Sequence, residues 1–208
     1  MRLWAALAVG MVGLGWSMAV TAHPHAWIDV SVEVLFDAAG RVSALRQGWL
    51  FDEFYTADTV QKGERSKMDL LTTRIMHNLK DWGYFTRVRQ GGRDLPLAMP
   101  TQTSARMDGH RLLMTFVVPL AEAVAPGQDG LTYSVFDPTY FIEMLHAETA
   151  DAIRLTGAPA QCRFRLLPAK PDPKAVAVAA AIDRTRSGGD GLGAQFGEKV
   201  EIKCDVQP

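Results

Sequence analysis

Two histidines flank a proline at the start of the stretch HPHAWIDV, which opens at His23. Imidazole nitrogens bind nickel, cobalt, zinc and copper, so His23 and His25 form a candidate clasp for a divalent transition metal. If the chain is cut after Ala22, the free amine and the ring of His23 can chelate one ion, and His25 adds a second imidazole. The alternative is that both histidines are only the exposed polar start of a first β-strand.

Pro24 limits the geometry of such a clasp. The amino-terminal copper or nickel site with histidine in third place needs deprotonated backbone amides at positions two and three. A proline at position two has no N–H to lose, so the square-planar site with four nitrogens is blocked. We expect instead a brace of one amine and two imidazoles, completed by side chains from elsewhere in the fold.

The clasp depends on the removal of residues 1–22, which have the pattern of a signal peptide. Arg2 supplies a positive charge, an almost wholly apolar run follows from Leu3 to Val20, and small residues allow cleavage after Ala19 or Ala22. The alternative is an uncleaved membrane anchor, because the run approaches the length of a spanning helix. Its small-residue exit and the lack of a basic cluster after it favour cleavage. We therefore predict a soluble periplasmic protein.

The composition fits an exported protein. The chain has 22 basic and 23 acidic residues and a formal net charge of -1, which argues against nucleic acid or an anionic membrane surface as the main partner. Its two cysteines, Cys162 and Cys204, are expected to form a disulfide in an oxidising compartment. A thiolate metal pair or a redox couple is the alternative, although there is no Cys-x-x-Cys spacing.

A fold made mostly of strands must position these residues. Apolar and polar residues alternate from Ile28 to Phe36 and again from Val42 to Phe51, which predicts a hairpin whose outer face carries Trp27, Asp29 and Glu33. Shorter strands are predicted at 84–89, 94–98, 101–107, 111–120, 131–136, 140–145, 162–166 and 199–204.

Two segments have the period of a helix. Apolar residues at spacings of three and four predict one amphipathic helix over about 66–82, with a separate turn of helix at 57–62 before it. An alanine-rich helix is predicted at about 172–185, and a flexible glycine-rich loop near 187–193 that lacks the ending of a phosphate-binding loop. Strands that follow strands predict the α+β class, with one domain over 23–208 built on a mainly antiparallel, sandwich-like sheet.

Five segments occur in one order along the chain: HPHAWID from His23, WLFDEFY from Trp49, FDPTYFIEM from Phe136, GAPAQC ending at Cys162, and LGAQFGEKVEIKC ending at Cys204. Together they resemble a bacterial periplasmic family of unknown function, labelled an ABC-type uncharacterised transport system, periplasmic component. Members look like companions of nickel/cobalt permeases. The resemblance therefore implies an inner-membrane permease of that type as the partner, but no settled chemistry.

The resemblance also points to three carboxylates as candidate metal ligands beside the histidines. Asp52 and Glu53 lie in the second segment, and Asp137 lies in the third. Each has a structural alternative, because Asp52 and Glu53 could cap or begin a helix. Asp137, which precedes Pro138, could start an Asx turn.

Three functions stay open. The first is a metal-binding or delivery component of a nickel/cobalt-type transport system, and the second is an extracytoplasmic partner of the permease without its own metal. The third is an enzyme that uses a histidine brace with copper. There is no Ser/His/Asp order, no His-Glu-x-x-His and no cofactor fingerprint, so we expect no enzyme. The remaining histidines, His77, His110 and His146, are expected at the surface.

Overall fold

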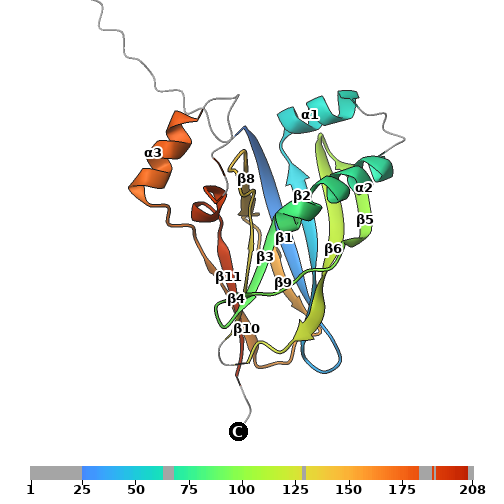
Figure 1. Cartoon of the computed structure of the whole chain (residues 1–208). Helices are drawn as coiled ribbons and strands as arrows, with labels where there is room; N and C mark the ends of the chain where they lie inside the picture. The colour runs from blue at the N-terminus through green and yellow to red at the C-terminus, as the bar shows by residue number, and fades with distance from the viewer. Residues whose placement is uncertain (1–24, 63–67, 128–129, 183–188, 190, 206–208) are drawn as a thin grey trace, which may run out of the picture.

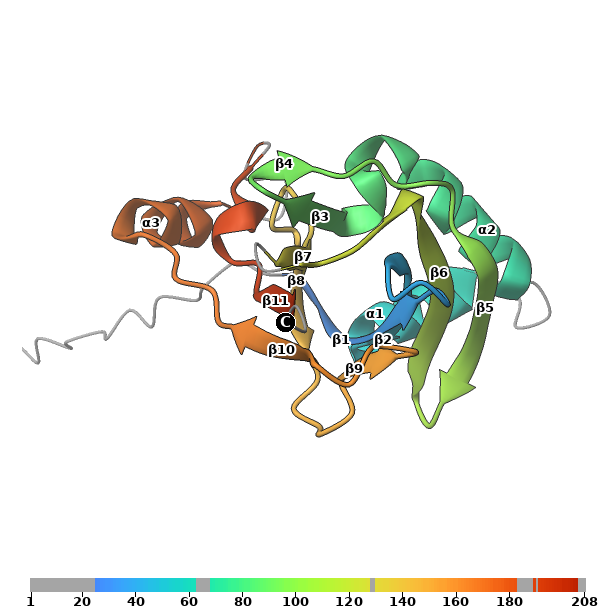
Figure 2. The same ribbon diagram turned by 90° about the horizontal axis from the view of Figure 1, so that it is seen from below.

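Two β-sheets face each other and hold the core between them (Figure 2). The computed structural model describes residues 25–62, 68–127, 130–182, 189 and 191–205. The first sheet contains β1 (Ala26–Phe36), β2 (Val42–Phe51), β5 (Thr101–Asp108), β6 (Arg111–Val124), β8 (Ile142–His146) and β9 (Ile153–Thr156). The second contains β3 (Thr86–Gln90), β4 (Arg93–Asp94), β7 (Leu131–Val135), β10 (Cys162–Leu167) and β11 (Lys199–Cys204). The strand orders are β5-β6-β2-β1-β8, with β9 also on β1, and β10-β11-β7-β3-β4.

The predicted α+β class with mainly antiparallel sheets is confirmed. β1 pairs with β2 and β5 with β6 as antiparallel hairpins. The alternation in β1 places Ile28, Val30 and Val32 inside, each at most 2 % exposed, whereas Trp27 on the other face is 47 % exposed. Side chains from both sheets, such as Trp49 and Tyr133, meet in one apolar cluster.

The parallel pairs of β1 were not predicted. The edge of β1 away from β2 pairs with β8 along its first half and with β9 along its second half, both in the parallel sense. β9 was missed because its four residues are too few to show a period of two. The start of β1 therefore lies beside the start of β8, which matters for the candidate site.

The helices differ from their predicted bounds. α1 (Glu53–Lys62) begins directly after β2, earlier than the predicted turn of helix, and α2 (Met68–Asn78) packs along β5 (Figure 1). The helix predicted over 66–82 is wrong at its end, because the chain leaves α2 at Asn78 and continues as the 3₁₀ segment η2 (Lys80–Phe85), with a kink at Gly83. Trp82 is consequently off the helix and 43 % exposed.

The C-terminal helix is shorter than predicted. α3 spans Pro173–Ala181, and the side chain of Asp172 caps it by accepting a hydrogen bond from the Ala175 N–H. Residues 183–185 of the predicted helix lie outside the described residues. After the glycine-rich segment a short 3₁₀ turn, η3 (Gly193–Gln195), leads into β11.

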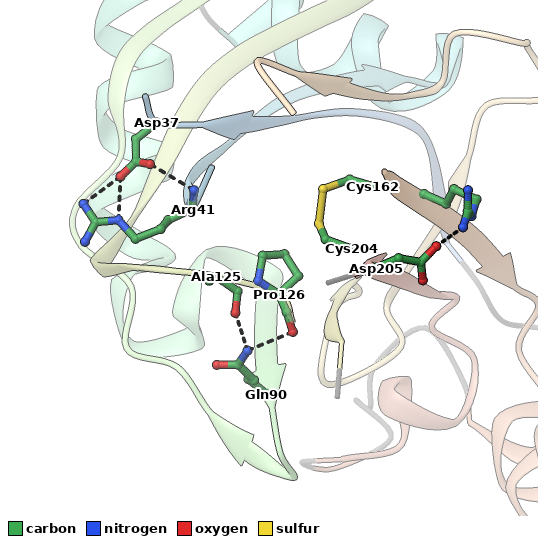
Figure 3. The surroundings of a disulfide bond; sticks show 9 residues. Asp37, Arg41, Gln90, Ala125, Pro126, Cys162, Cys204 and Asp205 are labelled. Atoms are coloured by element: carbon green, nitrogen blue, oxygen red, sulfur yellow. Dashed lines mark hydrogen bonds and ion pairs between the residues drawn. A yellow bond between two sulfur atoms is a disulfide. The ribbon is translucent and has the colours of Figure 1, made fainter. Parts of the chain in front are cut away.

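The predicted disulfide between Cys162 and Cys204 is confirmed. It joins directly opposite positions of β10 and β11 (Figure 3). The cysteines are 42 residues apart in sequence, and closing a loop of that length in the unfolded chain stabilises a fold by about 4 kcal/mol. Such a bridge is typical of proteins outside the reducing cytoplasm. The predicted signal peptide lies outside the described residues, among which no helix is long and apolar enough to cross a membrane.

Candidate functional site

His25, Asp52, Glu53 and Asp137, four of the five predicted metal ligands, lie on segments that share one end of the first sheet. Because β1 runs antiparallel to β2 and parallel to β8, the start of β1, the end of β2 and the start of β8 share that end. α1 begins there too (Figure 1). We call this place the β1 end and define it by His25, Asp52, Glu53 and the turn 137–141. His23 lies outside the described residues.

His25 is held in place just before β1. Its backbone N–H donates a 3.0 Å hydrogen bond to the carbonyl oxygen of Phe141, the last residue before β8. Its ring lies 4.8 Å from the Phe141 ring, centroid to centroid, at an interplanar angle of 55°. The side chain is half-buried, with Nε2 enclosed. The imidazole is therefore fixed against an aromatic ring at the β1 end.

The Asp52 carboxylate serves as a helix cap. One oxygen accepts a 2.8 Å hydrogen bond from the Tyr55 N–H in the first turn of α1. The other accepts a 2.9 Å bond from the Trp27 N–H and so ties β1 to the helix start. Glu53 is exposed in the same first turn, and its carboxylate makes no hydrogen bond or ion pair with another described residue. Asp52 thus has the capping role that the sequence allowed, whereas the carboxylate of Glu53 stays available as a metal ligand.

Asp137 forms the predicted Asx turn. It is 4 % exposed, and one carboxylate oxygen accepts 2.9 Å hydrogen bonds from both the N–H and the hydroxyl of Thr139. The other oxygen accepts a 3.0 Å bond from the Ile142 N–H at the start of β8. The carboxylate therefore shapes the turn that leads into β8.

The glycine-rich segment near the C-terminus docks on this turn. The N–H groups of Gly191 and Gly193 both donate to the Pro138 carbonyl oxygen. A Cβ at Gly193 would lie 1.7 Å from the carbonyl oxygen of Asp137, so only glycine fits there. Tyr140 and Phe196 stack with their centroids 3.8 Å apart. The third and fifth of the sequence segments that carry the family resemblance thus form one packed unit.

This geometry narrows the possible metal chemistry at the β1 end. The carboxylates of Asp52 and Asp137 already accept backbone N–H groups, and withdrawing either for a metal would leave those donors unsatisfied. Within the described part of the chain no three His, Cys, Asp or Glu side chains gather as a metal site. The ligand set of His23, His25, Asp52, Glu53 and Asp137 stays a prediction.

A buried polar chain that the sequence did not reveal links the two sheets. His146 was expected at the surface, but its side chain is only 3 % exposed. Its Nδ1 lies 2.8 Å from a carboxylate oxygen of Glu198, and its Nε2 lies 3.1 Å from the hydroxyl of Tyr133 on β7. The alternation of Ile142, Met144 and His146 along β8 is the signal that could have indicated an inward position. His77 and His110 are exposed, as predicted.

The surroundings of these three hydrogen-bonded side chains shift the pKa values of Tyr133 and Glu198. Burial, and then the nearby Glu198 charge, raise the pKa of the Tyr133 phenol well above its usual range. Burial acts to raise the pKa of the Glu198 carboxyl, but hydrogen bonds from the ring and backbone of His146 outweigh it and lower the value. Tyr133 is fully buried, and these hydrogen bonds join β7, β8 and the residue before β11.

Comparisons with known proteins give a family without an assigned activity. An uncharacterized protein of Haemophilus influenzae is 25 % identical over 202 residues, which cover 94 % of this chain and 97 % of the relative. No solved structure matches the chain. The family described as "Protein of unknown function (DUF1007)" matches over residues 8–204, nearly the whole chain. The chain therefore belongs to the family of unknown function DUF1007.

Proposed function

We propose that the protein is a periplasmic accessory component of a nickel/cobalt-type transport system and binds a divalent transition metal through its N-terminal His-Pro-His. The observation that carries this proposal is the fixed position of His25, which is bonded to the Phe141 backbone and packed on its ring. A histidine held in one place loses less conformational freedom when it binds a metal than one on a free tail. The disulfide supports an oxidising compartment.

The donors in this proposal are fewer than the sequence allowed. The imidazoles of His23 and His25 and, after cleavage at Ala22, the terminal amine form the clasp, with nickel, cobalt, zinc or copper as candidate ions. Glu53 is the carboxylate best suited to join them, since Asp52 and Asp137 are engaged by backbone N–H groups. The metal is cargo or a bound ligand here, and the protein catalyses no reaction.

Metal titration of the purified mature protein tests this proposal. Intact mass first establishes the amino terminus, and calorimetry then measures the affinity for nickel, cobalt, zinc and copper. We expect His25→Ala to weaken the preferred metal by about tenfold or more, and Glu53→Gln to weaken it less. His110→Ala is the matched control, because His110 is exposed in the turn between β5 and β6. Equal affinities of wild type and His25→Ala would rule out the clasp, and copper-dependent oxidation of an organic substrate would favour an enzyme instead.

A permease partner without a metal of its own is the second candidate. Its support is a group of exposed aromatic side chains on the segments that meet at the β1 end: Trp27, Phe54 and Phe141 are 47 %, 88 % and 39 % exposed. Exposed aromatic residues are enriched where proteins dock. Co-purification with the permease that Phe54→Ser abolishes, together with no metal binding below millimolar concentration, would favour this candidate over the first.

A further inference from the structure

A hollow away from the β1 end opens beside the second sheet. Its volume is about 640 Å³, within the range of sites that hold small organic molecules. It is bounded by η2, the first half of β3, the segment 94–99 and the turn at Phe136 and Pro138. None of the predicted metal ligands lines it. We call it the Arg87 hollow, after the arginine of β3 in its wall.

Aromatic and apolar side chains form most of the wall. Tyr84 and Phe136 line it and are buried, at 5 % and 8 % exposure. Trp82 and Met99 are 43 % and 53 % exposed and line it as well. Large apolar groups that stay open to solvent in a concave place can take up the apolar body of a ligand.

The backbone of the wall is strained and firmly held. Gly83, Tyr84 and Phe85 have φ values of 60°, 57° and 53°, and each left-handed non-glycine residue costs about 1 kcal/mol or more. Tyr84 is held on both sides, since its N–H donates to the Leu79 carbonyl and its carbonyl accepts from the Thr86 hydroxyl. The N–H of Phe136 donates to the Phe85 carbonyl. Strain that the surroundings maintain is common at ligand sites, so the shape of the wall is preformed.

The charges in the wall favour an anion. Asp94 is paired with Arg89 at 2.8 Å, so its charge is already balanced. The guanidinium of Arg87 lies 5.3 Å from the centroid of the Phe136 ring, and no described carboxylate pairs with it or with Lys80. Asp81 is the other acidic residue of the lining. Two unpaired cations against one unpaired anion leave a positive excess, and an arginine stacked on an aromatic ring keeps its planar edge free for a carboxylate.

We propose that the Arg87 hollow binds a small organic acid with an aromatic or apolar body and one carboxylate. The carboxylate pairs with the guanidinium of Arg87, and the body packs between Trp82 and the apolar wall at Phe136. This inference does not depend on metal binding at the β1 end.

Calorimetry with three phenylalkyl probes of one length tests the proposal: 4-phenylbutyrate, 4-phenylbutanol and 4-phenylbutylamine. We expect the carboxylate to bind at least about tenfold more tightly than the alcohol, and the amine to bind most weakly. Arg87→Gln should weaken 4-phenylbutyrate by about tenfold and leave the alcohol unchanged, whereas Trp82→Ala should weaken both.

Two matched controls separate the site from general effects. Arg93→Gln removes an exposed cation of β4 that lies outside the lining and leaves the pair of Arg89 and Asp94 intact, and Trp27→Ala removes an exposed tryptophan from the first sheet. Both should bind 4-phenylbutyrate as wild type does. Amide NMR spectra of each variant check that the fold is kept. Equal affinity for the three probes, no binding of 4-phenylbutyrate at millimolar concentration, or an unchanged affinity in a folded Arg87→Gln would overturn the proposal.

Discussion

The turn at Phe136–Pro138 has two sides that treat charged groups in opposite ways. On one side Asp137 is buried, and its carboxylate accepts three hydrogen bonds from Thr139 and Ile142. On the other side Phe136 and Pro138 line the hollow where Arg87 has no carboxylate partner among the described residues. The residue type that suggested chemistry in the sequence is thus committed to structure, while an arginine without any motif is available for a ligand.

The difference shows that a charged side chain is a good candidate for ligand binding when it is not already bonded within the protein, whatever its residue type. A carboxylate that has to turn away from backbone N–H groups to reach a metal leaves those donors without partners, at a cost of about 1–3 kcal/mol for each. An exposed guanidinium gives up no hydrogen bond within the protein when it binds a ligand, because its N–H groups are bonded only to water beforehand. Three substitutions test this contrast.

The largest effect is expected for Asp137→Ala. Loss of three accepted hydrogen bonds at a buried site should lower the free energy of unfolding by about 3–5 kcal/mol, measured by urea denaturation. Asp137→Asn should lose less, since its one carbonyl oxygen can keep the bonds from Thr139. A loss below about 1 kcal/mol in the alanine variant would mean that the carboxylate is not structural and would return Asp137 to the candidate ligands.

A smaller, pH-dependent effect is expected for Glu198→Gln, because Glu198, like Asp137, is a carboxylate that accepts hydrogen bonds inside the fold. The pKa of Glu198 is lowered below its ordinary value of 4.5. Its charged form therefore stabilises the fold fully above that value, and this contribution is lost as the pH falls through the lower pKa of the folded state. Wild type should exceed the variant by about 1–2 kcal/mol at pH 7, and urea denaturation at several pH values should show the gap shrinking in acid.

The exposed Glu122 on β6 offers the control for this measurement. Glu122→Gln should leave the free energy of unfolding near that of wild type at pH 7. A gap between wild type and Glu198→Gln that stays constant or widens in acid would contradict the role given to the bond between His146 and Glu198.

The smallest effect on stability is expected for Arg87→Gln, in the wall of the Arg87 hollow. Among the described residues its guanidinium makes no hydrogen bond or ion pair and lies over the Phe136 ring, so the free energy of unfolding should change by at most about 1 kcal/mol. Thermal and urea denaturation measure this without any ligand. A loss comparable to that of Asp137→Ala would show that Arg87 holds the turn together, and the contrast between the two sides would disappear.

Local patterns predicted much of the fold. The alternation along β1 and β2 predicted their hairpin and its inner face, because a strand exposes alternate residues to opposite sides. The pairing of Cys162 with Cys204 was predicted from two cysteines in a chain with the pattern of a signal peptide. The capping role of Asp52 and the turn at Asp137 were foreseen as alternatives, since both depend on neighbours in sequence.

Other features escaped prediction because they depend on distant contacts. The apolar spacing that predicted a helix up to Trp82 continued past its real end, where bonds from Leu79, Thr86 and Phe136 hold the left-handed turn at Gly83–Phe85. The burial of His146 requires Glu198, 52 positions away. The spacing of apolar residues along a short segment carries no information about pairs of residues that are so far apart in sequence.

The sequence by itself determined the longer strands and the local turns, because hydrophobic period and side-chain bonds to nearby backbone act over a few residues. Its two cysteines left one intramolecular pairing for the disulfide. Only the tertiary structure decided which charged groups are free. The parallel pairing of β8 with β1 placed the turn of Asp137 beside His25, and the docking of Gly191 and Gly193 closed that turn. The tie between Asp52 and β1 is likewise a property of the packed chain, since its donor, the Trp27 N–H, lies 25 positions away in sequence.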